Sequence, residues 1–93
     1  MQDKEFYKNG QKIHELKENY LIYYFKDGKV KAEGIFEQEL MEGEWKFYRD
    51  TGQLWQIGNF KGVKKNGHWV RYDRDGNVEY DELFENDKKV KRK

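Results

Sequence analysis

The chain has no cysteine, no proline and no serine, and its one threonine is Thr51. Without cysteine, disulfide bonds and thiolate metal sites are excluded. A hydroxyl nucleophile is excluded as well, because Thr51 lies in the turn-type sequence Asp-Thr-Gly. The histidines, His14 and His68, do not have the spacing of a metal-binding pair. We therefore expect no catalytic residue, no metal site and no cofactor, and a protein that is not an enzyme.

Long apolar runs and an excess of one charge are also missing, since 19 basic residues stand against 18 acidic ones. A charged fraction of 40% and a mean hydropathy of -1.29 are typical of disordered chains. The aromatic content of 17% is not, and it indicates a folded domain. The charged start of the chain, residues 1–5, does not look like a signal peptide. These features favour a soluble protein in the cytoplasm.

A 24-residue repeat organises the sequence. Gly28, Gly52 and Gly76 are 24 residues apart. The same step relates further columns of similar residues: Leu21, Trp45 and Trp69; Tyr24, Tyr48 and Tyr72; Val30, Leu54 and Val78; Phe36, Phe60 and Phe84; and Gly34 with Gly58, where the third member is Glu82. We interpret residues 1–93 as one domain, with a partial repeat at 4–18, repeats at 19–42, 43–66 and 67–90, and a basic tail at 88–93.

Each repeat is predicted to form a β-hairpin. Two runs of β-prone residues flank a turn sequence that ends in glycine, a strong local signal for a hairpin. Glu42-Gly43 and Asn66-Gly67 stand where one unit is expected to turn into the next. The sequence thus predicts an all-β fold, an antiparallel meander of hairpins in a single twisted sheet.

The turn also predicts a register. With Thr51 and Gly52 as the central turn residues, Trp45 lies opposite Gly58. The same rule places Leu21 opposite Gly34 and Trp69 opposite Glu82. A glycine beside a large ring leaves a slot in which the ring lies on the sheet. A three-residue turn with a bulge would shift this register.

The N-terminal part is less regular. Residues 6–13 look like a shortened hairpin around Asn9-Gly10. Ile13, Leu16 and Tyr20 have helical spacing, so a short helix over residues 11–18 is the alternative. We favour the strand, because Asn-Gly is a hairpin signal and no helix cap precedes the segment.

The basic run at residues 88–93 is the strongest cluster of one charge. Such a run can bind anionic lipid or nucleic acid. A disordered, solubilising end is the interpretation that we favour, so membrane and nucleic-acid partners are not expected.

The motif that runs from Gly43-Glu44-Trp45-Lys46-Phe47-Tyr48 through Gly52 to Gly58-Asn59-Phe60-Lys61-Gly62 and Asn66-Gly67-His68-Trp69 resembles the MORN repeat variant family. The resemblance covers roughly residues 19–86. It implies repeated hairpins that serve binding or scaffolding, in a bacterial protein. Some bacterial members are labelled antitoxins, and better-known MORN proteins are associated with membranes. Asn19, Leu21 and Glu82 depart from the motif and indicate degenerate end repeats.

The aromatic residues are the candidate binding residues: Trp45, Tyr48, Trp55, Trp69 and Tyr72. The structural interpretation is a spine of rings stacked from unit to unit along the sheet. The functional interpretation is an exposed groove for another protein. Trp55 is the better candidate for a specific contact, because Lys31 and Glu79 occupy its column in the other units. We therefore expect a protein-interaction or scaffolding module, with an antitoxin-type inhibitor or an anionic-lipid binder as alternatives, and with homo-oligomers through a sheet edge as a further option.

Overall fold

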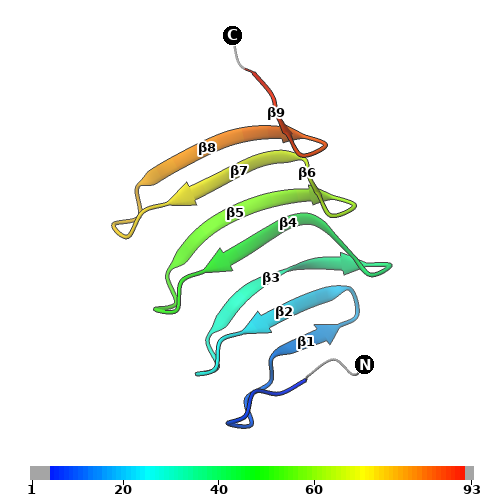
Figure 1. Cartoon of the computed structure of the whole chain (residues 1–93), viewed down its shortest axis with the longest axis vertical. Helices are drawn as coiled ribbons and strands as arrows, with labels where there is room; N and C mark the ends of the chain where they lie inside the picture. The colour runs from blue at the N-terminus through cyan, green and yellow to red at the C-terminus, as the bar shows by residue number, and fades with distance from the viewer. Residues whose placement is uncertain (1–4, 92–93) are drawn as a thin grey trace.

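The computed structural model describes residues 5–91, and these form nine strands and no helix (Figure 1). The strands are β1 (His14–Lys17), β2 (Tyr20–Tyr24), β3 (Val30–Glu37), β4 (Leu40–Tyr48), β5 (Leu54–Lys61), β6 (Lys64–Lys65), β7 (Gly67–Tyr72), β8 (Val78–Glu85) and β9 (Lys88–Lys89). They make one antiparallel sheet in the order β1-β2-β3-β4-β5-β7-β8-β9, and β6 pairs with β5. The predicted all-β meander is confirmed. Lys4 of the partial repeat and Arg92 and Lys93 of the tail lie outside the described residues. Within the described part, no helix is long and apolar enough to cross a membrane.

The glycine turns line up along one side of the sheet, on the left in Figure 1. In each of them a three-residue loop replaces the predicted two-residue turn. The amide of Gly52 donates to the carbonyl of Arg49 at 2.9 Å, and the amide of Arg49 donates to the carbonyl of Gln53 at 2.8 Å. Gly52 has a φ of 97°, a conformation that glycine adopts without steric cost. The same two hydrogen bonds close the turns at Gly28 and Gly76.

A β-bulge beside each glycine turn restores the predicted register. Tyr48 pairs with Leu54, but Phe47 pairs with Gln56, so Trp55 is an extra residue in β5. The loop shifts the pairing by one residue and the bulge shifts it back. For this reason the predicted pair of Trp45 and Gly58 is correct although the predicted turn was wrong. The pairs of Leu21 with Gly34 and of Trp69 with Glu82 are confirmed too.

The turns between units differ from the prediction. The chain reverses at residues 38–39, 62–63 and 86–87, all with positive φ, and not at Glu42-Gly43 or Asn66-Gly67. Gln38 and Glu39 have φ values of 51° and 65°. Two successive left-handed residues make the tight turn that suits the twist of a hairpin. Gly43, with a φ of 67°, instead lies inside β4 where the pairing with β3 is irregular.

The core lies on one face of the sheet, along a spine of tryptophan and phenylalanine rings. Trp45 is fully buried and Trp69 is 5% exposed. The ring of Trp45 lies over Gly34, where a Cβ atom would come within 2.4 Å of it. Trp69 covers Gly58 in the same way, at 2.6 Å. Each glycine slot therefore holds the ring of the following unit, whereas the sequence suggested the ring of its own unit.

Hydrogen bonds and ring contacts extend this spine. The Nε1 of Trp45 donates to the carbonyl of Ile35 at 2.8 Å, and the Nε1 of Trp69 donates to that of Asn59 at 2.9 Å. Phe60 stands edge-on to both tryptophans, with ring centroids at 6.5 and 5.1 Å. The stacked spine predicted for the aromatic residues is thus present.

Both ends of the sheet are short hairpins. At the N-terminus Phe6 pairs with Lys12 around the Asn9-Gly10 turn, and residues 14–17 form β1, so the helical alternative was wrong. At the C-terminus β9 pairs with the end of β8. The first two residues of the basic tail therefore belong to the sheet, because the turn at residues 86–87 folds them back onto β8.

Candidate functional site

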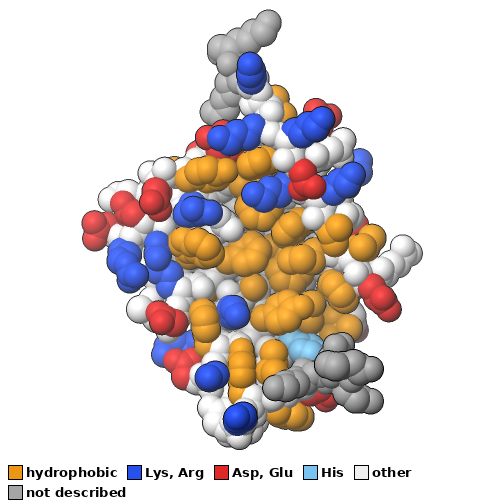
Figure 2. Space-filling view, viewed as in Figure 1, with side chains coloured by type: hydrophobic (Ala, Val, Ile, Leu, Met, Phe, Trp, Pro, Cys, Tyr) orange, Lys and Arg blue, Asp and Glu red, His pale blue; other side chains and the backbone are white. Residues whose placement is uncertain are grey.

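The sheet has two faces that differ in chemistry. We name the face that carries Trp45, Phe47, Trp69 and Arg71 the tryptophan face, because alternate residues of β4 and β7 point to it. Figure 2 shows hydrophobic side chains gathered over the middle of this face, with Lys and Arg side chains among them. Because the described residues form a single layer, no second layer covers these rings.

A groove of about 480 Å³ opens on the tryptophan face beside the glycine turns. Trp45 and Ala32, both buried, belong to its lining. Its other main lining residues are aromatic or basic: Tyr23, Phe25, Lys31, Phe47 and Trp55. No carboxylate of the described residues lines it. The groove is therefore apolar, with positive charge at its border.

The bulge in β5 places Trp55 in this groove. In a regular strand Trp55 would point away from the face occupied by its neighbour Gln56. At the bulge, Trp55 lines the groove while the side chain of Gln56 is bonded to Arg71 on the same face. The extra residue thus adds an aromatic wall that the other units do not have.

Arg71 is held beside the groove by three contacts. Its guanidinium carbon lies 5.0 Å from the ring centroid of Trp55 and 5.3 Å from that of Tyr80. Its Nε donates to the Oε1 of Gln56 at 3.1 Å, and Gln56 is only 8% exposed. The Nη groups of Arg71 make no hydrogen bond with the described residues. Arg71 therefore presents a fixed, charged fork with free donors.

Lys31 is the second cation. It occupies the bulge position of the first unit, and its Nζ lies 5.8 Å from the ring centroid of Phe25. Its side chain is exposed, and it forms no ion pair with the described residues. Lys31 thus adds an exposed positive charge to the groove that Trp55 also lines.

The opposite face carries tyrosine–carboxylate pairs. The hydroxyl groups of Tyr48 and Tyr20 donate to the two carboxylate oxygens of Glu33, at 2.5 and 3.0 Å. Burial, and next the hydrogen bond to Glu33, raises the pKa of Tyr48 well above its usual value of about 10. Tyr24 donates to Glu15 at 2.8 Å, and this bond raises the pKa of Tyr24 and lowers that of Glu15. These pairs stabilise the sheet and keep the phenols protonated.

The five predicted binding residues separate into two groups. Trp45 and Trp55 line the groove, and Tyr48 borders it although its hydroxyl is bonded to Glu33 on the opposite face. Trp69 and Tyr72 do not line it. Trp69 is covered by Lys65, whose Nζ lies 4.8 Å from its ring centroid.

Sequence reasoning missed Phe25 and Lys31, which line the groove, and Arg71, which packs on Trp55 beside it. The signal that could have found them is the bulge column itself, in which Lys31 and Trp55 occupy equivalent positions. Arg71 then follows as the residue that pairs with Gln56 from the next strand.

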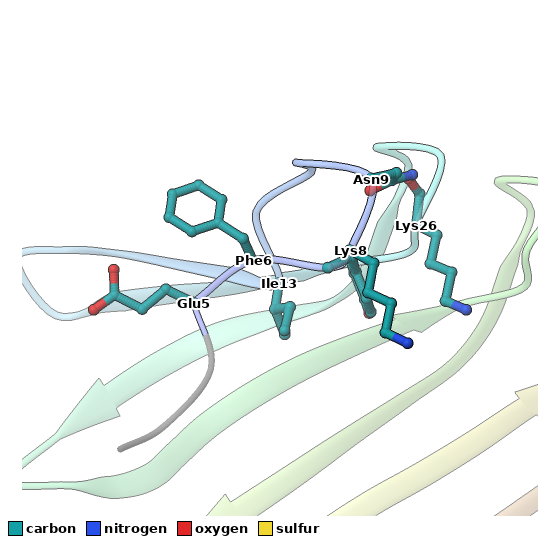
Figure 3. Close-up of a pocket in the computed structure, with 7 residues that line it drawn as sticks. Glu5, Phe6, Lys8, Asn9, Ile13 and Lys26 are labelled. Carbon is teal, nitrogen blue, oxygen red and sulfur yellow. The ribbon is translucent and has the colours of Figure 1, made fainter.

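A second depression lies at the N-terminal hairpin, where Figure 3 shows Phe6, Lys8, Asn9 and Ile13 with Lys26. Its residues come from one edge hairpin and the neighbouring turn, and Phe6 is 51% exposed. No group of three or more His, Asp or Glu side chains within residues 5–91 could hold a metal ion. The groove on the tryptophan face therefore remains the candidate site.

Comparison with known proteins gives one family. Residues 41–61 and 65–86 match the model of the MORN repeat variant. No curated protein and no solved structure matches the chain significantly. The matched segments coincide with the hairpins β4–β5 and β7–β8 and include the spine residues Trp45 and Trp69. MORN repeats are non-catalytic and generally serve interaction with proteins or membranes. The resemblance to the MORN repeat variant family is thus confirmed for these two units.

Proposed function

We propose that the chain is a non-enzymatic interaction module that binds a partner protein in the groove of the tryptophan face. The observation that carries this proposal is the uncovered groove between Phe25, Phe47 and Trp55. Exposed apolar patches bordered by polar groups commonly mark interaction sites. Trp, Tyr and Arg are also the residues that most often dominate binding energy at protein interfaces.

The other functions suggested by the sequence have less support. No contact among residues 5–91 favours an antitoxin over another kind of interaction module. The lipid-binding alternative is motivated by the basic tail and by the MORN resemblance, and the first two residues of that tail, Lys88 and Lys89, pair with β8. Association of copies through the sheet edges stays a prediction, as does a cytoplasmic location.

The test compares three baits: the wild-type chain, Trp55→Ala and Val78→Ala. Val78 is 58% exposed and does not line the groove, so its variant is the matched control. Proteins retained from a native extract are identified, and the strongest is purified and titrated against each bait. We expect Trp55→Ala to weaken binding by about 30-fold, as truncation of a hot-spot aromatic does. Equal affinities for Trp55→Ala and wild type would contradict the proposal, provided that circular dichroism shows both to be folded.

A further inference from the structure

We propose that the groove recognises a peptide segment in which an acidic side chain stands next to a large apolar one. This inference rests on the proposed function and specifies the chemistry of the partner. It follows from an apolar cavity that Lys31 lines, from Arg71 packed on the lining residue Trp55, and from the absence of a lining carboxylate among the described residues.

The apolar half of the site is the groove itself. Phe25, Phe47 and Trp55 present ring surfaces to a space of about 480 Å³. A phenylalanine, leucine or tryptophan side chain of a partner would bury its surface against these rings. Burial of such side chains is a major source of affinity at protein interfaces.

The charged half of the site is Arg71. Its stacking on Trp55 and Tyr80 and its bond to Gln56 fix the guanidinium group before any partner arrives. A planar guanidinium with free Nη groups matches a carboxylate with two parallel hydrogen bonds. Because the fork is already ordered, little conformational entropy is lost on binding. The geometry suits a carboxylate beside the apolar side chain that enters the groove.

Charge complementarity supports an acidic partner further. Lys31 places a second positive charge on the groove. The acidic Asp27 nearby is already paired with Lys29, at 3.0 Å. On the opposite face, the carboxylate of Glu33 accepts bonds from Tyr20 and Tyr48. Asp27 and Asp50 lie with Lys31 around a neighbouring depression, but neither Lys31 nor Arg71 forms an ion pair with a carboxylate of the described residues.

The experiment starts from a random peptide library displayed on phage and selected against the full chain. The best peptide is made with a fluorophore, and its Kd is measured for the wild type, Lys31→Glu and Lys46→Glu. Lys46 is exposed and lies on the opposite face, because it stands between Trp45 and Phe47 in β4. Lys46→Glu changes the net charge by the same amount as Lys31→Glu but away from the groove, and it is therefore the control. A third variant, Arg71→Lys, keeps the positive charge and removes the planar guanidinium group with its paired donors.

We expect enrichment of Asp or Glu adjacent to Phe, Leu or Trp. We also expect Lys31→Glu and Arg71→Lys each to raise the Kd about tenfold or more, and Lys46→Glu to change it less than about twofold. Replacing the acidic residue of the peptide by its amide should produce a similar loss for the wild type. Because Lys31 is exposed, Lys31→Glu keeps the test valid even if Arg71→Lys lowers stability.

Four outcomes would overturn the inference. Selected peptides that are apolar but not acidic, or equal Kd values for Lys31→Glu and Lys46→Glu, would reduce the site to an apolar groove and leave the proposed function standing. Failure to select any peptide would exclude recognition of linear segments, and the titration of the purified partner would still decide the function. Binding to vesicles that contain phosphatidylserine, lost in Lys31→Glu and not accompanied by peptide binding, would indicate a lipid surface instead.

Discussion

At the scale of single residues, the fold depends on tryptophan rings that lie on glycines of the preceding unit. Trp45 covers Gly34 and Trp69 covers Gly58, and each indole donates a hydrogen bond to that same strand. A side chain at either glycine would occupy the volume of the ring. The contact joins neighbouring hairpins and replaces the second layer that a single sheet does not have.

Gly58→Ala is therefore expected to lower the free energy of unfolding by about 2 kcal/mol or more, as overpacking of a tight site does. The cause is the 2.6 Å approach of the new Cβ atom to the ring of Trp69. Urea unfolding followed by circular dichroism measures the change.

A double-mutant cycle with Trp69→Leu separates this cause from a general effect of alanine in β5. Gly58→Ala should cost clearly less in the Trp69→Leu background than in the wild type. The same cost in both backgrounds would show that the ring does not need the slot.

Tyr48 predicts an alkaline limit of stability. Its pKa in the folded state is raised above the value of about 10 in the unfolded chain, so the protonated phenol favours the folded state. This contribution is fully present below about pH 10 and is lost as the pH rises toward the folded pKa. The fall in stability above pH 10 should be smaller in Tyr48→Phe than in the wild type, in urea unfolding series at several pH values. Parallel curves for the two proteins would refute the role of Tyr48.

The residue pairs show what the sequence could and could not predict. The pair of Trp45 and Gly58 followed from the turn position and the repeat step. Which glycine the indole covers could not be predicted from the turn and the repeat. Trp45 pairs with Gly34 on one side and with Gly58 on the other. Both glycines are direct cross-strand partners of Trp45, so only the side-chain packing determines which of them the ring covers.

At the scale of the hairpin, the turn and the bulge act together. A three-residue turn that ends in a left-handed glycine moves the register by one residue, and the bulge at Lys31, Trp55 or Glu79 returns it. The strands stay in phase from unit to unit as a result. The extra residue is also free to differ between units, because it has no partner in the ladder. In the second unit the bulge residue is Trp55, and its side chain lines the groove.

The linking turns were not predictable in the same way. Gln38-Glu39 contains no glycine, asparagine or aspartate, so no local signal marks it as a turn. Both residues nevertheless have positive φ, since the two-residue turn between β3 and β4 requires it. The glycines that attracted the prediction, Gly43 and Gly67, relieve irregular pairing inside or next to strands instead.

The positive φ values of Gln38 and Glu39 suggest a stabilising substitution. Replacement of Gln38-Glu39 by Asn-Gly should raise the free energy of unfolding by about 1 kcal/mol, because Asn and Gly adopt the left-handed conformation with less strain. The midpoint of thermal unfolding should rise by about 4–8 °C. Glu44→Gly in β4 is the control, and it should lower the midpoint, because Glu44 is exposed and does not have positive φ. A lower midpoint for the Asn-Gly variant would contradict the assigned turn geometry.

At the scale of the whole molecule, the described residues form an open sheet with one aromatic face. The spine buries Trp45 completely, while Tyr23 stays 37% exposed near the groove. The repeat supplies the spine in every unit, so the spine could be predicted from the 24-residue columns. Of the groove, the irregular column predicted Trp55 alone. Phe25, Lys31 and the neighbouring Arg71 also break the columns, but their position beside Trp55 depends on the bulge and the strand pairing. The proposed site thus lies where the repeat is least regular.

The most direct test of the groove as the binding site is an NMR titration of the ¹⁵N-labelled chain with the selected acidic, apolar peptide. We expect saturable shifts at the amides of Phe25, Lys31, Trp55 and Arg71, and weaker shifts for Lys31→Glu than for Lys46→Glu. Shifts that cluster on the opposite face or along the free edge of β8, or none at a saturating excess of peptide, would contradict it.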